Sequence, residues 1–189
     1  MLFRMKEENK AILRSRAREM AQEPEKQTTD SLITNFLIFD LAGETYGINA
    51  TFVREVYPLK DYTSLPGVPS YILGILNVRG QILTIVNLKK LFKLPEKGLG
   101  ELNKVIIIRN HKMEFGIMAD SIMGIKTFPY DSIGELPATF TGVGSDYLKG
   151  ITPENIIILD GEKILGDNKI IIDEKIDIEL TQYDLNLNK

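Results

Sequence analysis

Few side chains in this sequence are of the kinds that move protons, attack a carbonyl or hold a metal. His111 is the only histidine, and it lies in the polar turn 109–112, where an exposed side chain needs no catalytic reason. Cysteine is absent, which excludes thiolate nucleophiles, disulfides, zinc fingers and iron–sulfur clusters. Metal ligands cluster, and one histidine provides no cluster. We therefore expect no catalytic residue and no bound metal.

The nucleotide-binding motifs are incomplete. Gly98-Leu99-Gly100 and Gly142-Val143-Gly144 both lack the third glycine and the preceding strand of a dinucleotide site, and no phosphate loop ends in Gly-Lys-Ser/Thr. The serines lack the context of a nucleophile elbow. A pair of catalytic carboxylates stays open, because such pairs need not be close in sequence. The sequence thus favours a protein without a cofactor.

The composition indicates one globular domain of the cytosol. The chain has 189 residues, of which 43% are hydrophobic and 26% charged, a balance typical of a packed core. With 23 basic and 26 acidic residues and no basic stripe, nucleic acid is not an expected partner. No apolar run is long enough to span a bilayer, so we expect no membrane insertion.

The two ends of the chain differ from its centre. Residues 1–30 are predicted to be a helical extension and linker, with a helix over 6–22 that ends before Pro24. This helix either packs weakly on the domain or docks to a partner. Residues 31–173 form the main domain, and the acidic residues 174–189 are expected to be a tail.

The main domain contains a repeat with an offset of 69 residues. The segment 36–56 resembles 105–125: each has an apolar strand followed by aromatic-Gly-Ile, at Tyr46-Gly47-Ile48 and Phe115-Gly116-Ile117. Val53 and Val56 match Ile122 and Ile125. A second matched pair joins 65–75 to 136–151, and two such pairs in the same order indicate duplication.

The repeat predicts two small β lobes, at about 35–92 and 103–172, each closing as a small barrel or curved sheet, and leaves open whether strands cross between the lobes. Because a lobe of this size is only marginally stable alone, we expect the lobes to share a core, placed at the triple-isoleucine strands 106–108, 156–158 and 170–172. Hairpin turns are expected at 40–44, with Gly43 in an unusual backbone conformation, and at 110–114, with Asn110 in that role. Residues 88–92 are predicted to form a short helix.

Five motifs in order resemble the chemotaxis coupling family called CheW. They are Glu44-Thr-Tyr-Gly-Ile-Asn49, Val53-Arg-Glu-Val56, Leu65-Pro-Gly-Val-Pro69, Gly74-Ile-Leu-Asn-Val-Arg-Gly80 and Ile82-Leu-Thr-Ile-Val-Asn-Leu88. The resemblance implies an all-β fold of two five-stranded SH3-like barrels with short helices. It also implies a non-enzymatic cytoplasmic adaptor in receptor arrays, which couples the tips of methyl-accepting chemoreceptors to the regulatory domain of the histidine kinase CheA. Other CheW-like domains are further candidate partners.

The resemblance and the apolar pattern nominate a partner-binding surface of eight residues: Ile48, Val53, Glu55, Val56, Gly74, Asn77, Arg79 and Gly80. Val53 could instead fill the core, and Gly74 could be required only by the backbone, since Gly150 occupies the same place in the second copy. Arg79-Gly80 is expected to be a hairpin turn.

Comparison of the two copies adds a hypothesis about charge. Glu55 aligns with Gly124 and Arg79 aligns with Asn155, so at these positions only the first copy carries both charges. We expect Glu55 and Arg79 to meet and to shape a partner-facing patch. Two alternatives remain open: a small-ligand or enzymatic domain that uses a cleft between the lobes, and an array component that binds receptors without engaging a kinase.

Overall fold

The computed structural model describes residues 32–95, 103–138, 140, 144–167 and 170, and every element below belongs to the unit that begins at Ile33. The expected N-terminal helix, the acidic tail and the glycine loop at 98–100 lie outside the described residues. The elements from the first copy of the repeat are β1 (Ile33–Leu41), β2 (Glu44–Asn49), the 3-10 turn η1 (Ala50–Phe52), β3 (Val53–Pro58), β4 (Ile72–Val78), β5 (Gln81–Val86) and α2 (Leu88–Phe92).

The second copy gives a matching set of strands in the same order. Its elements are β6 (Lys104–Arg109), β7 (Glu114–Ala119), β8 (Ser121–Pro129), the 3-10 turns η2 (Tyr130–Ser132) and η3 (Ser145–Tyr147), β9 (Leu148–Ile151), β10 (Ile157–Leu159) and α3 (Gly161–Gly166). The short helix predicted at 88–92 is confirmed. Helix α3 was missed, although Asp160 caps it as Asn87 caps α2.

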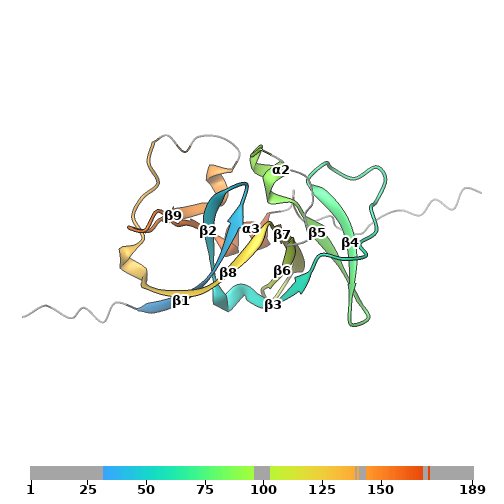
Figure 1. Ribbon diagram of the computed structural model, residues 1–189, viewed down its shortest axis with the longest axis horizontal. Helices are drawn as coiled ribbons and strands as arrows, with labels where there is room; N and C mark the ends of the chain where they lie inside the picture. Colours follow the sequence, from blue (N-terminus) through green and yellow to red (C-terminus); the bar gives the residue numbers. More distant parts are fainter. Residues whose placement is uncertain (1–31, 96–102, 139, 141–143, 168–169, 171–189) are drawn as a thin grey trace, which may run out of the picture. The chain divides into compact units, whose positions relative to one another are not determined.

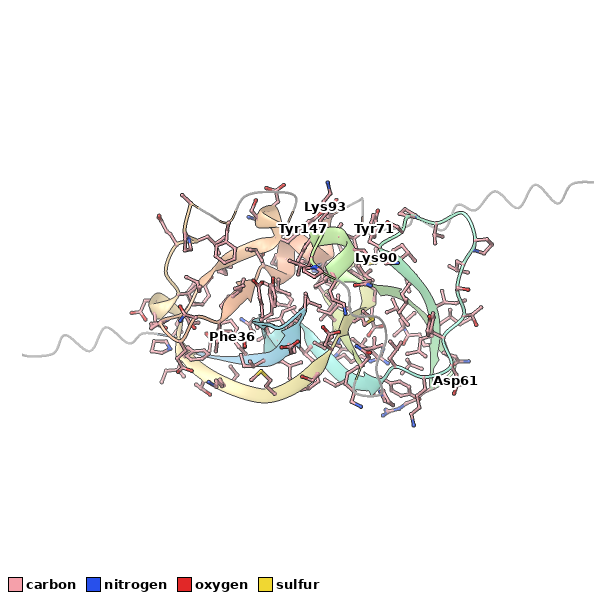
Figure 2. All side chains as sticks on the ribbon, turned by 45° about the horizontal axis from the view of Figure 1, so that its top comes forward. Phe36, Asp61, Tyr71, Lys90, Lys93 and Tyr147 are labelled. Atoms are coloured by element: carbon pink, nitrogen blue, oxygen red, sulfur yellow. The ribbon has the colours of Figure 1, made fainter. Side chains whose placement is uncertain are left out.

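The strands form two five-stranded sheets, as the all-β fold class predicted (Figure 1). One sheet has the order β8-β1-β2-β10-β9 and the other β3-β6-β7-β5-β4. We call the first barrel A and the second barrel B. If each strand is replaced by its repeat equivalent, the order of barrel A becomes that of barrel B.

The sequence left open whether strands cross between the two lobes, and in the structure they do: the two repeats exchange hairpins, so the barrels do not coincide with the ranges 35–92 and 103–172. Hairpin β1-β2 of the first copy completes barrel A with β8, β9 and β10, and hairpin β6-β7 of the second copy completes barrel B. The exchanged hairpins are joined to their new neighbours partly by parallel pairs, β2 with β10 and β7 with β5.

Chain connectivity explains the exchange. Ala119, at the end of β7, lies opposite Lys104, and Asp120 alone separates β7 from β8. If β8 paired within its own copy as β3 pairs with β6, Ile122 would lie opposite Ile108. Measured from Ala119, that position is about 13 Å along the strand and about 10 Å across the sheet. The three residues from Ala119 to Ile122 span at most about 11 Å. The chain must therefore enter the other barrel.

The hairpin turns confirm the expected glycine and correct the expected asparagine. Ala42 and Gly43 both have positive φ, 61° and 89°, as a tight hairpin with a right-handed twist requires. Asn110 is not among the described residues with positive φ. Its side-chain oxygen instead accepts hydrogen bonds from the N–H groups of Lys112 and Met113, both at 2.8 Å.

The core has three parts that follow from strand alternation. On β6, Val105 and Ile107 face a core inside barrel B, while Ile106 and Ile108 face a larger core shared by both barrels. Strand β1 does the same for barrel A, and a third cluster fills that barrel. The shared core expected at the triple-isoleucine strands is confirmed for 106–108 and 156–158; of the third run only Ile170 is described, and it is buried.

An ion pair between a buried lysine and a partly buried aspartate fixes the crossover from barrel B to barrel A. The Lys89 side chain, only 2% exposed, donates to Asp120 Oδ1 at 2.6 Å. Asn103 also donates to Oδ1, and the N–H of Ala42 donates to Oδ2 at 2.8 Å. Burial raises the pKa of Asp120, but the hydrogen bonds from Lys89 and Ala42 outweigh it and leave the pKa below its usual range. The linker residue thus holds elements of both barrels.

The variant Asp120→Ala should lower the free energy of unfolding at pH 7 by about 3 kcal/mol, because it leaves the Lys89 ammonium buried without its counter-charge. Urea unfolding would measure the loss. The control is Glu154→Ala, which breaks the exposed Lys126–Glu154 pair and should cost less than about 1 kcal/mol. Equal losses of unfolding free energy in the two variants would contradict the conclusion that the Lys89–Asp120 pair stabilises the crossover.

The difference between wild type and Asp120→Ala should also depend on pH. Because the folded-state pKa of Asp120 is depressed, its stabilisation is fully present above the ordinary pKa of an aspartate and is lost as the pH falls through the folded value. The same urea experiment repeated along a series from pH 7 to pH 2 should show the gap narrowing only at the acid end. A gap that stayed constant would argue against the ion pair as its source.

Candidate partner-binding site

A bulge in β3 places two charged residues next to each other at one end of barrel B. The pairing of β3 with β6 shifts between Val53 and Glu55, so Arg54 has no partner residue in the ladder. Glu55 lies opposite Ile107, which faces the core of barrel B. Bulges redirect side chains in this way and are frequent beside functional sites.

Three polar residues cap this end of the barrel B core. Gln81 alternates with Leu83 and Ile85 on β5, and Glu114 alternates with Gly116 and Met118 on β7, so each lies on the core-facing side of its strand. Glu55 likewise lies on the core-facing side of its strand, β3. On each of these three strands, the core-facing position at this end of the barrel holds a polar side chain, whereas the core-facing positions further along the strand hold apolar residues. Water can therefore reach the groups that cover this end of the core.

Glu55 and Arg79 meet, as the comparison of the repeats predicted. Arg79 Nη2 lies 3.1 Å from Glu55 Oε2, with the arginine side chain 79% exposed and the glutamate 21% exposed. An ion pair with one largely exposed partner contributes little to the free energy of unfolding. Its value would lie in orienting two charges for recognition.

Arg79 lies in the β4-β5 hairpin turn, as expected. Arg79 and Gly80 both have positive φ, 54° and 89°, and the N–H of Gly80 donates to Asn77 Oδ1 at 2.8 Å. Asn155 has φ 60° at the equivalent turn of barrel A. Asparagine tolerates this conformation better than arginine, so the turn alone does not account for an arginine at position 79.

Arg54 joins the pair to the rest of the barrel opening. Its Nε and Nη2 donate to Glu55 Oε1 at 3.0 and 2.8 Å, and its Nη1 donates to Gln81 at 2.8 Å and to Glu114 at 2.5 Å. Gln81 Nε2 also donates to Glu114 Oε2 at 2.8 Å. We call Arg54, Glu55, Arg79, Gln81 and Glu114 the mouth network.

The network favours the charged forms of Arg54 and Glu114. Hydrogen bonds to Glu55 and Glu114 raise the pKa of Arg54 above its already high value. Burial raises the pKa of Glu114, but the hydrogen bonds from Gln81 and Arg54 outweigh it and lower the pKa. Glu114 therefore stays ionised at neutral pH.

The other predicted residues divide between surface and interior. Val56 follows Glu55 on β3 and is 38% exposed, and Asn77 and Gly80 are exposed in the turn. Val53 is half-buried and packs against the shared core, which agrees with the alternative that it fills the core. Ile48 is a correction: it is 0% exposed because it faces the shared core from β2, so it cannot touch a partner in this structure.

Gly74 has a backbone reason of its own. It has φ 150°, and a Cβ there would lie 2.1 Å from the carbonyl oxygen of Thr63. Thr63 forms an isolated β-bridge with Ile75, the residue after Gly74. A Cβ on Gly150 would lie 2.2 Å from the carbonyl oxygen of Gly134, at the equivalent bridge in barrel A. In both barrels a glycine therefore allows the same close approach to a backbone carbonyl oxygen. This agrees with the alternative that Gly74 is required by the backbone.

Sequence reasoning missed exposed apolar residues on β5 and β8. Met123 and Ile125 on β8 are 62% and 65% exposed, and Ile82 on β5 is 63% exposed. The offset of 69 residues makes Met123 the equivalent of Arg54 and Ile125 the equivalent of Val56. The repeat therefore contained the signal for β8, but no apolar position in a strand shows from sequence alone which face is covered.

Other kinds of site find no support in the described part of the chain. No three His, Asp or Glu side chains lie together there as metal ligands, and no helix there is long and apolar enough to cross a bilayer. The alternative of a ligand-binding domain requires a cleft between the lobes, where the structure has the shared apolar core. A cavity of about 190 Å³ near Phe92 and Leu148 is smaller than the roughly 300 Å³ of small-molecule sites.

Comparison with known proteins decides the family. Residues 35–169 match the family model of the CheW-like domain. The chain belongs to this family. A chemotaxis protein CheW from Treponema pallidum is 30% identical over 139 residues, which cover 70% of this chain and 82% of the relative. A CheW from Klebsiella aerogenes is 27% identical over 140 residues, covering 72% and 84%.

A solved CheW structure has the same fold. The scaffolding protein TtCheW from Thermoanaerobacter tengcongensis matches with a TM-score of 0.60 and 30% identity, over 68% of this chain and 89% of that chain. The CheW family consists of non-enzymatic chemotaxis adaptors, and this chain is one of them. The paired SH3-like barrels expected from the sequence are therefore confirmed.

The glycine contact predicts equal sensitivity in the two barrels. Gly74→Ala and Gly150→Ala should each lower the free energy of unfolding by about 2 kcal/mol or more, since the new Cβ would displace backbone. Gly166→Ala is the control, because nothing lies within 4 Å of a Cβ there. Thermal unfolding followed by circular dichroism would measure all three; a harmless Gly74→Ala would point to a contact role for Gly74 instead.

Proposed function

We propose that the chain holds the regulatory domain of the kinase CheA and the cytoplasmic tips of methyl-accepting receptors together, in the cytoplasm at receptor arrays. The names of its relatives as chemotaxis proteins and of the neighbour TtCheW as a scaffolding protein support this role. An adaptor of this kind needs no chemical step, because holding two partners at once raises their effective concentration.

The observation that carries the proposal is the combination of charge and apolar surface at the mouth of barrel B. Arg79 of the Glu55–Arg79 pair is largely exposed, Val56 follows Glu55 on β3 and is 38% exposed, and Ile82 is exposed on β5 just after the turn that carries Arg79. Partner interfaces typically combine an apolar centre with polar groups that fix orientation. We assign Val56, Glu55, Asn77, Arg79 and Gly80 to the contact surface.

A second apolar surface lies on β8 of barrel A. Met123 and Ile125 are more exposed than Val56, and β8 is an edge strand of its sheet. Val53 and Ile122, at equivalent positions on β3 and β8, both pack half-buried against the shared core. We propose that β8 supplies a contact surface separate from the mouth network, which gives the adaptor two faces of different chemistry.

Binding to the CheA regulatory domain tests the adaptor role directly. Calorimetry should show one-to-one binding, and the complex should still bind a receptor-tip fragment. Binding of the receptor fragment alone would favour the array component that does not engage a kinase. A thermal-shift screen that found a stabilising metabolite, with neither partner bound, would favour the small-ligand alternative.

A double-mutant cycle tests whether the Glu55–Arg79 pair acts as a unit. The variants Glu55→Ala and Arg79→Ala should each weaken kinase-domain or receptor binding, and the double variant should lose less than the sum, with a coupling of about 0.5 to 2 kcal/mol. The same cycle on Lys126 and Glu154, the exposed pair of barrel A, serves as the control. Additive losses at Glu55 and Arg79 would remove the pair as a recognition unit.

A further inference from the structure

We propose that Arg54 is a positioning residue that holds the Glu55–Arg79 pair in its binding orientation without itself touching the partner. The inference rests on the proposed function, since it concerns the same surface. It concerns a residue for which neither the sequence motifs nor the repeat predicted a role.

The contacts of Arg54 are all directed into the protein. Each of its three side-chain nitrogens donates to a carboxylate or amide oxygen of Glu55, Gln81 or Glu114. The side chain is only 19% exposed, whereas that of Arg79 is 79% exposed. A guanidinium whose donors are used within the chain orients its neighbours rather than binding another protein.

The two oxygens of Glu55 are divided between the two arginines. Oε1 accepts from Arg54 and Oε2 lies next to Arg79. Because Arg54 is itself anchored to Glu114 on β7 and to Gln81 on β5, the Glu55 side chain is fixed relative to the barrel before any partner arrives. Side chains ordered in advance lower the entropy lost on association.

Barrel A shows that this network is not needed to close a barrel. At the equivalent positions it has Met123 for Arg54, Gly124 for Glu55 and Thr45 for Glu114. Barrel A nevertheless forms the same five-stranded sheet with the same glycine bridge. The network is therefore an addition to the fold in barrel B, located where the proposed contact surface lies.

The charges in the network also balance. Arg54 and Arg79 face Glu55 and Glu114, two positive against two negative groups, and Arg109, opposite Glu114 on β6, adds a positive charge from outside the network. Removing Arg54 would take away the group that pairs with both Glu55 and Glu114. Glu55 would then lose its inner anchor, and Arg79 would lose the fixed partner that orients it.

The test compares Arg54→Met and Arg54→Lys with the control Lys163→Met, which removes the exposed cation of the Asp160–Lys163 pair on α3, outside both proposed contact surfaces. In the free full-length chain, nitrogen relaxation should show a lower order parameter for the Arg79 Nε–Hε bond in Arg54→Met. Affinity for the CheA regulatory domain should fall about 3- to 10-fold, mainly through faster dissociation. Lysine, which lacks the planar fork, should restore it only in part. Lys163→Met should leave both quantities unchanged.

Two results would overturn the inference: an unchanged Arg79 order parameter in Arg54→Met, even with a lower melting temperature, or an affinity loss that Lys163→Met reproduces. If Arg54→Met does not fold, Glu114→Gln gives a milder loosening of the same anchor and should move both readouts in the same direction. A wild-type chain that did not bind the kinase domain would reject the proposed function, while the order parameter would still decide the role of Arg54.

Discussion

The short connection between β7 and β8 is the constraint on which the rest of the structure depends. With Asp120 as the only residue between these strands, β8 cannot reach the edge of its own hairpin and must join the other barrel. Each barrel is then built from both copies of the repeat, and neither can form without the other. The shared core follows, because the exchanged strands carry apolar residues on both faces.

This arrangement gives an adaptor a rigid frame with two different faces. The polar groups of Asp120, Lys89 and Asn103 bind elements of both barrels at the crossover, and directional hydrogen bonds fix an angle that apolar contact alone would leave loose. Duplication supplied two equivalent surfaces on this frame. They diverged, so that barrel B carries the mouth network and barrel A carries the exposed Met123 and Ile125.

The sequence allowed prediction of what depends on local pattern. The repeat, the turn at Arg79-Gly80, the helix at 88–92 and the isoleucine strands with two buried faces all follow from spacing and residue type. The hairpin exchange could not be seen, because both copies offer the same pairing pattern and only the connection length decides between them. Ile48 was misplaced because an apolar residue in a strand gives no sign of which face is covered. Arg54 was missed because its partners, Gln81 and Glu114, are distant in sequence.

Native-state hydrogen exchange tests the central claim, that hairpin exchange makes the two barrels one cooperative unit. The variant Ile158→Ala would remove side-chain volume from the core of barrel A alone. If the barrels unfold together, the most protected amides of β6 and β7 in barrel B should lose the same free energy of opening as those of β1 and β2 in barrel A. Loss confined to barrel A, with barrel B protection unchanged, would contradict the claim.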